Sequence, residues 1–237
     1  MSARGAAPAP RREYVAQAYE SLRRLIVQGH LAPGMRLVEA ELADKLGMSR
    51  TPLRTALYLL NQEGYVEANG EGRQSRLIVA PLTQDDALEV FGIVGEIEGL
   101  AAQRTALLDA TPRQAIASEL RGLNGAMGKA ALHRPPNPAE TIRLDTDFHR
   151  TYVEAGAGRR LLAFFRSAKP QADRFIHLYH STLTTALLVS IREHDAIIDA
   201  IADGNAKGAR RAVQENWENA AVRLCKSIAA IGERGVW

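Results

Sequence analysis

Residues 42–64, LADKLGMSRTPLRTALYLLNQEG, decide the fold of this chain, because they predict two short helices joined by a tight turn. Gly47 supplies the turn, and Ser49 stands at the start of the second helix, where we expect its side chain to cap a free N–H group. The first helix has an apolar face made by Leu42, Ala43 and Leu46. The pattern is typical of a helix-turn-helix.

The second helix of this motif presents polar and basic side chains on its outer side. Its apolar residues recur at helical spacing, at Leu53, Leu57 and Leu60. This spacing turns Arg50, Thr51 and Arg54 outward, and no acidic residue occurs between Ser49 and Gln62. Arginine can bind both major-groove acceptors of guanine, and hydroxyl groups at a helix N-terminus favour phosphate. We therefore expect Ser49, Arg50, Thr51 and Arg54 to contact double-stranded DNA.

The flanking segments predict a winged helix. Residues 65–68 and 76–79 are short strand-like runs around a loop that contains glycine. Arg73 lies in that loop, where we expect it to reach the DNA backbone or the minor groove. Upstream, an amphipathic helix that stops at Gly29 is indicated by Val15, Tyr19, Leu22, Leu25 and Ile26.

Residues 30–67, HLAPGMRLVEAELADKLGMSRTPLRTALYLLNQEGYVE, resemble the DNA-binding domain of the GntR family of bacterial transcription regulators, and the resemblance covers residues 13–81. By position, Arg50 and Arg54 match the recognition-helix arginines that contact operator DNA in the FadR subfamily. Some FadR-like proteins carry another DNA-contacting arginine where this chain has Ala40. The operator preference of those relatives therefore does not transfer to this sequence.

The charge of the chain is modest and unevenly placed. The chain has 237 residues, of which 46% are hydrophobic and 24% charged, as is ordinary for a soluble protein with two domains. Residues 1–81 hold 11 Lys and Arg against 8 Asp and Glu, whereas residues 82–237 hold 19 of each. The whole formal charge of +3 thus lies with the DNA motif, with which it agrees.

The remaining composition predicts a cytoplasmic protein. The single cysteine, Cys225, excludes an intramolecular disulfide, and its place on a helix indicates a buried thiol. No apolar run approaches the roughly 18 residues of a membrane span, and no signal peptide begins the chain, so we expect no membrane partner. Residues 1–12, rich in alanine, proline and arginine, are expected to form a disordered arm.

Helical periodicity replaces strand-like alternation after Pro81. Breaks at 111–112, 133–138, 156–158, 169–170 and 203–205 divide the segment into six or seven helices, which short loops would fold into an antiparallel bundle. The predicted fold is thus mainly α, with a winged helix-turn-helix domain at 13–81 and an all-helical effector-binding and dimerisation domain at 82–237.

Polar residues occur on the apolar faces of three of these helices. Asp145 and His149 lie four residues apart on one helix, His194 lies on a second, and Asn216 lies on the last. Buried without partners, these groups would cost several kcal/mol, so something must satisfy them. A divalent metal such as zinc, nickel, manganese or iron would do so. A hydrogen-bonded aspartate and histidine pair beside ordinary core histidines is the alternative.

Residues 82–228 resemble the FCD-type ligand-binding domain of the FadR subfamily, most clearly at LDTDFHRTYVEAGAGRRLL and REHDAIIDAIADGNAKGARRAVQEN. Metal-binding members of that subfamily place an aspartate and three histidines in the cavity. By position, Asp145, His149 and His194 match three of these ligands. The fourth position is Asn216, whose amide oxygen is a weaker ligand than imidazole, so the resemblance implies a three-ligand site completed by water or by an effector.

The resemblance also implies a mechanism. In similar proteins a small carboxylate effector docks at or beside the metal, and the helical domain forms the homodimer contact. Many relatives hold that carboxylate with an arginine four residues before the glutamate of the first bundle helix; with Glu98 as that glutamate, the position here is Val94. The candidate effector-binding residues in this chain are Arg174, Tyr152, His177 and His180.

The sequence thus predicts a repressor that is not an enzyme, binds operator DNA as a homodimer and responds to a small carboxylate. Two alternatives stay open. A metal-dependent hydrolase could use Asp145, His149 and His194 around an activated water, but we find no nucleophile motif or phosphate loop. A DNA-binding protein that senses no ligand would explain Arg50 and Arg54 but not the polar residues in the bundle.

Overall fold

A computed structural model describes residues 11–70, 76–133, 137–183 and 187–235, without the side chains of residues 11 and 180–188. The chain divides into two compact units. The first comprises Met1–Pro81 with Arg234–Trp237, and the second comprises Leu82–Glu233.

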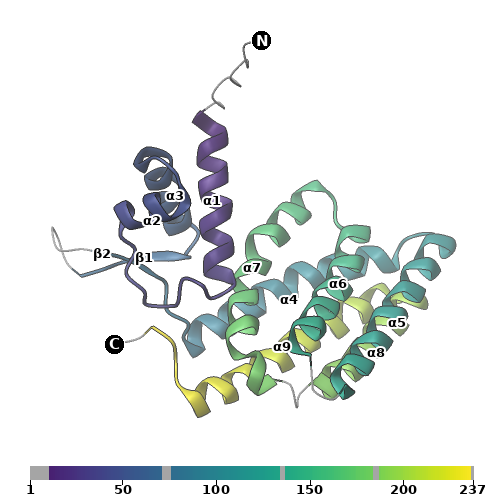
Figure 1. Ribbon diagram of the computed structural model, residues 1–237. Helices are drawn as coiled ribbons and strands as arrows, with labels where there is room; N and C mark the ends of the chain where they lie inside the picture. Colours follow the sequence, from purple (N-terminus) through teal and green to yellow (C-terminus); the bar gives the residue numbers. More distant parts are fainter. Residues whose placement is uncertain (1–10, 71–75, 134–136, 184–186, 236–237) are drawn as a thin grey trace, which may run out of the picture. The chain divides into compact units, whose positions relative to one another are not determined.

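The first unit is a winged helix-turn-helix, as the sequence predicts (Figure 1). Its elements are α1 (Arg11–Val27), α2 (Glu39–Leu46), α3 (Arg50–Gln62), β1 (Val66–Asn69) and β2 (Arg76–Val79). The two strands pair antiparallel, with Val66 opposite Val79. One apolar core holds the unit together, formed mainly by Leu22, Ile26, Leu31, Leu42, Leu53, Leu57, Leu60, Tyr65 and Val79.

The turn between α2 and α3 depends on Gly47. This residue has φ 63° and ψ 33°, a left-handed conformation that side chains other than glycine rarely adopt, and its N–H bonds back to the end of α2. Ser49 occupies the N-cap position of α3, but its side chain forms no capping hydrogen bond, so that prediction is wrong. Arg11 and Arg12, expected in the N-terminal arm, belong to α1.

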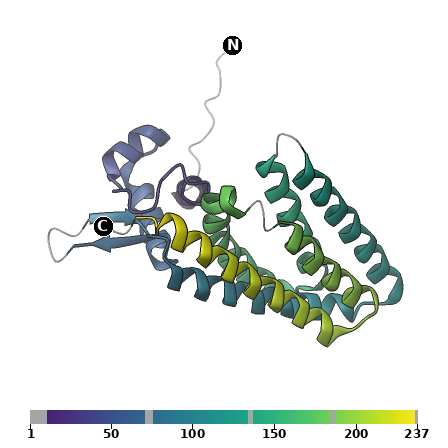
Figure 2. The same cartoon turned by 90° about the horizontal axis from the view of Figure 1, so that it is seen from below.

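The second unit is a helical bundle of six described helices. They are α4 (Gln84–Ala106), α5 (Ala110–Leu132), α6 (Pro138–Gly156), α7 (Arg159–Leu183), α8 (Leu187–Ala202) and α9 (Ala206–Ile231). Helices α4 and α9 lie side by side, and α8 packs between α5 and α9 (Figure 2). Within the described ranges, no helix is long and apolar enough to cross a membrane.

Two sequence predictions fail within this unit. The break expected at Lys169-Pro170 is absent, because α7 continues through Pro170. Pro170 has no backbone N–H, so α7 lacks one helical hydrogen bond there. The packing of this helix against the core compensates for the loss, through the buried residues Phe165, Ala172, Phe175 and Tyr179. Cys225 is half-buried rather than buried, and burial raises the pKa of its thiol.

A close approach between α4 and α6 fixes the relative position of the two helices. A Cβ atom at Gly156 would lie 2.2 Å from the backbone oxygen of Ala101, so only glycine fits there. Arg104 Nε donates to the Gly156 carbonyl over 2.8 Å, and Thr105 Oγ1 donates to the Tyr152 carbonyl over 2.7 Å. These contacts hold the polar residues of α6 against those of α4.

Candidate functional site

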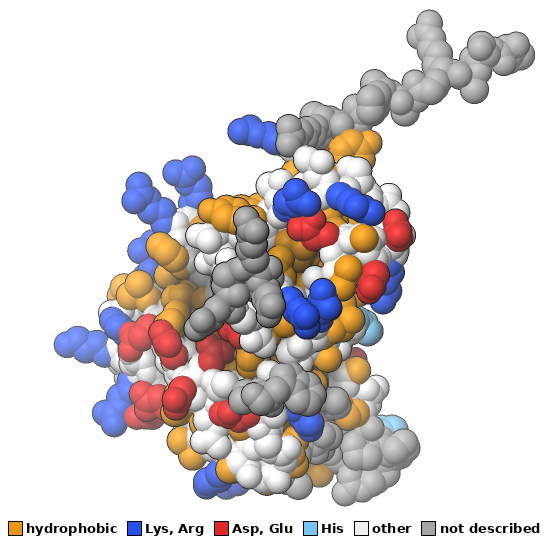
Figure 3. All heavy atoms as spheres, turned by 90° about the vertical axis from the view of Figure 1, so that its left-hand side faces the viewer, with side chains coloured by type: hydrophobic (Ala, Val, Ile, Leu, Met, Phe, Trp, Pro, Cys, Tyr) orange, Lys and Arg blue, Asp and Glu red, His pale blue; other side chains and the backbone are white. Residues whose placement is uncertain are grey.

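The predicted DNA-contacting residues gather on the exposed side of α3. Ser49, Arg50, Thr51 and Arg54 are all exposed, while the opposite side of the helix packs into the core. Glu39 of α2 holds the Arg54 guanidinium in a two-bond pair, at 3.0 Å from Nε and 2.8 Å from Nη2. Arg73 lies outside the described residues. Figure 3 shows one face of the molecule, on which basic side chains are interspersed with acidic ones.

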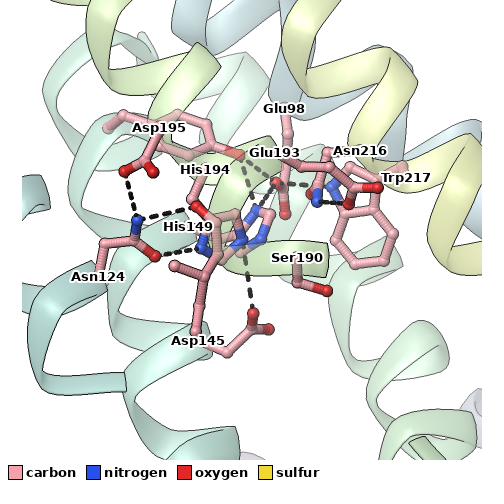
Figure 4. Close-up of polar contacts among 12 residues, drawn as sticks. Glu98, Asn124, Asp145, His149, Ser190, Glu193, His194, Asp195, Asn216 and Trp217 are labelled. Carbon is pink, nitrogen blue, oxygen red and sulfur yellow. Dashed lines mark hydrogen bonds and ion pairs between the residues drawn. The ribbon is translucent and has the colours of Figure 1, made fainter. Parts of the chain in front are cut away.

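In the helical unit, Asp145, His149 and His194 come together. Each offers one potential ligand atom, and these three atoms lie within 4.8 Å of one another. Asp145 and His149 extend from α6 and His194 from α8, so two helices supply the group (Figure 4). Both histidines are buried, whereas the Asp145 side chain is 25% exposed.

His149 is oriented by a buried carboxylate on α4. Its Nδ1 lies 2.6 Å from Glu98 Oε2 and 2.8 Å from the Tyr152 hydroxyl, which itself donates to Glu98. A carboxylate only accepts, so Nδ1 carries a proton and the neutral ring keeps its lone pair on Nε2. Burial lowers the pKa of His149, but Glu98 and Asp145 together outweigh burial, so the pKa is raised above its usual value. Burial likewise raises the pKa of Glu98, yet His149 brings it below its usual value.

His194 is oriented by an amide on α5. Asn124 Nδ2 donates to the Ile191 carbonyl and to Asp195, which leaves Asn124 Oδ1 to accept from His194 Nδ1 over 3.2 Å. The Nε2 atom of His194 lies 3.6 Å from Asp145 Oδ1 and, within the described ranges, has no hydrogen bond although it is buried. Burial, with His149 and Arg223, holds the pKa of His194 well below its usual value, which favours a neutral ring.

Asn216, the fourth predicted ligand position, is engaged elsewhere. Its Nδ2 donates to Glu193 Oε2 over 2.9 Å (Figure 4). Glu193 also forms a two-bond pair with Arg223. The structure thus places three of the four predicted ligands together and directs the amide nitrogen of the fourth toward α8.

The predicted effector-binding residues are dispersed. Tyr152 belongs to the site, because its hydroxyl contacts both Glu98 and His149. Arg174 is buried on α7, where it donates to Gln171. Arg174 also acts on Asp86 of α4: burial raises the pKa of that carboxyl, and the positive charge of Arg174 lowers it and so partly offsets the effect of burial. His177 is exposed, and the side chain of His180 lies outside the described part of the chain.

Sequence reasoning missed the residues that orient the histidines. Glu98 follows Phe91 and Val94 on the apolar stripe of α4, and Asn124 follows Leu120 on that of α5. A third buried polar residue, Lys169, contacts no histidine but was missed as well. It interrupts the apolar stripe of α7 four residues after Phe165. A polar side chain in phase with a buried stripe is the signal that could have found all three.

Comparison with known proteins defines the class to which this architecture belongs. Residues 15–73 match the family described as bacterial regulatory proteins, gntR family, and residues 89–219 match the FCD domain. The chain therefore belongs to the GntR family of DNA-binding transcription regulators, in the group that carries an FCD domain. Regulators of this family bind operator DNA and typically dimerise.

Individual relatives agree with this assignment. The chain is 31% identical over 199 residues to an HTH-type transcriptional regulator found in an unstable DNA locus of Streptomyces ambofaciens, covering 83% of this chain and 78% of the relative. It is 27% identical over 231 residues to the HTH-type transcriptional repressor NanR of Klebsiella aerogenes, covering 87% and 84%. The solved structure of E. coli McbR/YncC shares the fold with a TM-score of 0.68 at 19% identity, covering 90% and 97%.

Proposed function

We propose that this regulator is a repressor whose affinity for its operator is controlled by a small carboxylate bound at a metal site in the helical domain. The observation that carries the proposal is the group of three ligand atoms, from Asp145, His149 and His194, within 4.8 Å of one another. DNA binding by the winged helix does not require these three residues. We therefore assign them to a second role, the binding of a ligand.

The three residues suit a divalent transition metal. Two imidazoles and a carboxylate are ligands that zinc, nickel, manganese and iron accept. Each histidine has its Nδ1 fixed by an outer partner, Glu98 or Asn124, which is the usual support of a ligating imidazole. The buried, unpartnered Nε2 of His194 gains the most from an ion, since a buried polar atom without a partner costs free energy.

A metal at this site would be held by Asp145 and by His149 and His194, whose rings Glu98 and Asn124 orient. Such an ion would supply Lewis acidity toward an oxygen of the ligand's carboxylate. The ligands come from two helices, so occupancy of the site favours one spacing of α6 and α8.

On the DNA side, we propose that Arg50 and Arg54 contact bases, with Ser49, Thr51 and Arg73 on the backbone. Two copies of the chain would place two α3 helices in successive major grooves, at half-sites about one helical turn apart. A change in the helical domain then alters operator affinity through the distance between the two recognition helices.

The test is a titration of operator DNA with the full-length protein. An operator is selected from a random duplex library, and its affinity is measured by fluorescence anisotropy with metal-free protein, metal-loaded protein, and metal-loaded protein in citrate. We expect metal and citrate together to change the dissociation constant by about 5- to 150-fold. Equal affinity under the three conditions would refute ligand control and leave an unregulated DNA-binding protein.

A further inference from the structure

The C-terminal end of the chain leaves the helical unit and joins the winged helix. Residues up to Glu233 belong to the second unit, whereas Arg234 and Gly235 belong to the first. The chain therefore passes from one unit to the other twice, at Pro81-Leu82 and again at Glu233-Arg234. A single connection lets a domain turn freely about one point, whereas a second connection removes part of that freedom.

The helical unit holds the chain just before this second crossing. At the end of α9, the Gly232 carbonyl accepts from the Tyr179 hydroxyl of α7 over 3.0 Å. Glu233 Oε1 accepts from the backbone N–H of Gln84, the first residue of α4, over 2.9 Å. A carboxylate at a helix N-terminus meets backbone N–H groups that have no partner within the helix. The last residues of the second unit are thus fixed to both α4 and α7.

Gly235 fits closely against the backbone of the winged helix. Its φ of 82° is a left-handed conformation, and a Cβ atom there would collide with the backbone of Pro33 and Gly34. Only glycine therefore permits this approach. Gly34 in turn donates its N–H to the Val79 carbonyl of β2 over 2.8 Å. The C-terminal residues thus reach the segment that pairs with the second strand of the wing.

Both crossings lead to β2. This strand ends at Val79, from which the chain runs through the first crossing into α4. The second crossing reaches the same strand through Gly34, and the Met35 carbonyl extends the pairing by accepting from the Val79 N–H over 2.9 Å. The wing strand is therefore connected to the start of α4 by one segment and to the end of α9 by the other.

Helix α9 also reaches the candidate metal site. Trp217 lies on this helix and donates its indole N–H to Glu98 Oε2 over 2.9 Å, and Glu98 contacts His149. The helix runs without a break from Ala206 to Ile231. A shift of α9 at Trp217 is therefore carried along a rigid element to the second crossing.

We infer that residues 232–235 form a C-terminal strap, which transmits movement of α9 to β2 and so to operator binding. The inference rests on the proposed function for the origin of that movement. The C-terminal strap also acts without a ligand, because it limits how far the two winged helices of a dimer depart from the spacing that the operator requires. Its loss should therefore weaken operator binding and uncouple it from the helical domain.

Two variants release the C-terminal strap. Gly235→Ala places a methyl group against the backbone of Pro33 and Gly34, and a protein that ends at Glu233 lacks the docked residues altogether. Gly29→Ala is the matched control. Gly29 also has a left-handed φ, of 75°, but a Cβ atom there meets no atom of the described residues within 4 Å. The control thus reproduces the backbone strain without the collision.

Hydrogen exchange, measured by mass spectrometry on the metal-free proteins, reports whether the C-terminal strap is docked. We expect amide exchange in residues 33–37 to accelerate by about ten-fold or more in both variants, because the packed C-terminal residues no longer cover this segment. The control Gly29→Ala should exchange there at the wild-type rate. Wild-type exchange rates in both variants would overturn the docking.

Operator titration by fluorescence anisotropy tests the transmission. Without metal or citrate, we expect both variants to bind the operator about three- to ten-fold more weakly than wild type, since the spacing of the recognition helices is less restricted. Addition of metal and citrate should then change the dissociation constant of the variants by less than about two-fold, with metal content as in wild type. Wild-type affinity in both variants would overturn the C-terminal strap, even if exchange in residues 33–37 is faster.

The outcomes separate this inference from the proposed function. A response to metal and citrate that persists in full in both variants would overturn the transmission and leave the metal-dependent sensor intact. A wild-type protein that does not respond to metal and citrate would instead refute ligand control. The exchange rates and the operator affinities without ligand then decide the C-terminal strap by themselves.

Discussion

Glu98 and His149 form a buried acid and histidine pair, in which Glu98 Oε2 lies 2.6 Å from His149 Nδ1. The pair determines which ring nitrogen of His149 can ligate, since the carboxylate accepts the Nδ1 proton and leaves the Nε2 lone pair for an ion. Because Glu98 comes from α4 and His149 from α6, the contact links the first bundle helix to the candidate metal site.

Removal of the imidazole should remove the metal. His149→Ala deletes one of three proposed ligands, and we expect the variant to lose most of its bound metal after dialysis, measured by elemental analysis. His30→Ala, at an exposed histidine of the first unit, is the matched control and should retain the wild-type metal content. Equal metal content in the two variants would reject the site.

Glu98→Gln tests the support of that imidazole. The amide preserves the shape of the side chain but loses its charge, so we expect metal affinity to fall by about 10- to 100-fold while the ligands themselves remain. A competition titration with a chelator measures the change. The exposed neighbour Glu96, which pairs with Arg210 and Gln214, gives the control Glu96→Gln, for which we expect wild-type affinity.

Metal affinity should depend on pH through His149. The metal competes with the Nε2 proton, and Glu98 raises the pKa of His149 above its ordinary value of about 6.5. We therefore expect affinity to decrease as pH falls through this raised pKa, with proton release on metal binding measurable by calorimetry between about pH 5.5 and 8.5. Affinity that does not vary over this range would contradict a ligating His149.

In the metal-free protein, the stability that His149 contributes should depend on pH in the opposite direction and decrease as pH rises. A raised pKa means that the folded state binds the His149 proton more tightly than the unfolded chain does. The resulting stabilisation is fully present below the unfolded pKa of about 6.5 and is lost as pH rises through the folded pKa. Urea unfolding of metal-free wild type and His149→Ala across this range measures the difference, which should shrink with rising pH.

Arg54 should contribute strongly to operator binding. Arg54→Ala should weaken binding to the selected operator by about ten-fold or more and relax the base preference at one position, if its guanidinium contacts a base. Arg211→Ala, at an exposed arginine of α9, should bind like wild type. Wild-type affinity and base preference in Arg54→Ala would show that this residue does not read the operator.

Substitution by alanine should destabilise the protein at Gly156 and stabilise it at Gly122. Gly156→Ala forces a methyl group against the Ala101 carbonyl and Thr105, so we expect a loss of about 1–3 kcal/mol in the free energy of unfolding. Gly122→Ala on α5 meets no atom within 4 Å and should instead stabilise the protein by about 0.5–1 kcal/mol. Chemical denaturation measures both, and a neutral Gly156→Ala would mean that α4 and α6 separate readily.

The sequence predicts the winged helix and the helical bundle well, because hydrophobic periodicity and turn residues such as Gly47 act locally. The continuation of α7 through Pro170 escaped prediction, since tertiary packing of its apolar stripe overrides the local effect of proline. The spacing of Asp145 and His149 likewise predicts a shared helix face. The partners Glu98 and Asn124 lie on helices far away in the sequence. Their place on apolar stripes can mark them as buried polar residues, but only the packed structure shows which histidine each one contacts.

Crystallographic anomalous diffraction, recorded at the absorption edge of the metal in crystals of the metal-loaded protein, tests the account most directly. We predict one strong peak within bonding distance of Asp145 Oδ1, His149 Nε2 and His194 Nε2, with Glu98 and Asn124 still on the Nδ1 atoms. A map with no anomalous peak there, in which His194 simply hydrogen-bonds to Asp145, would contradict the account.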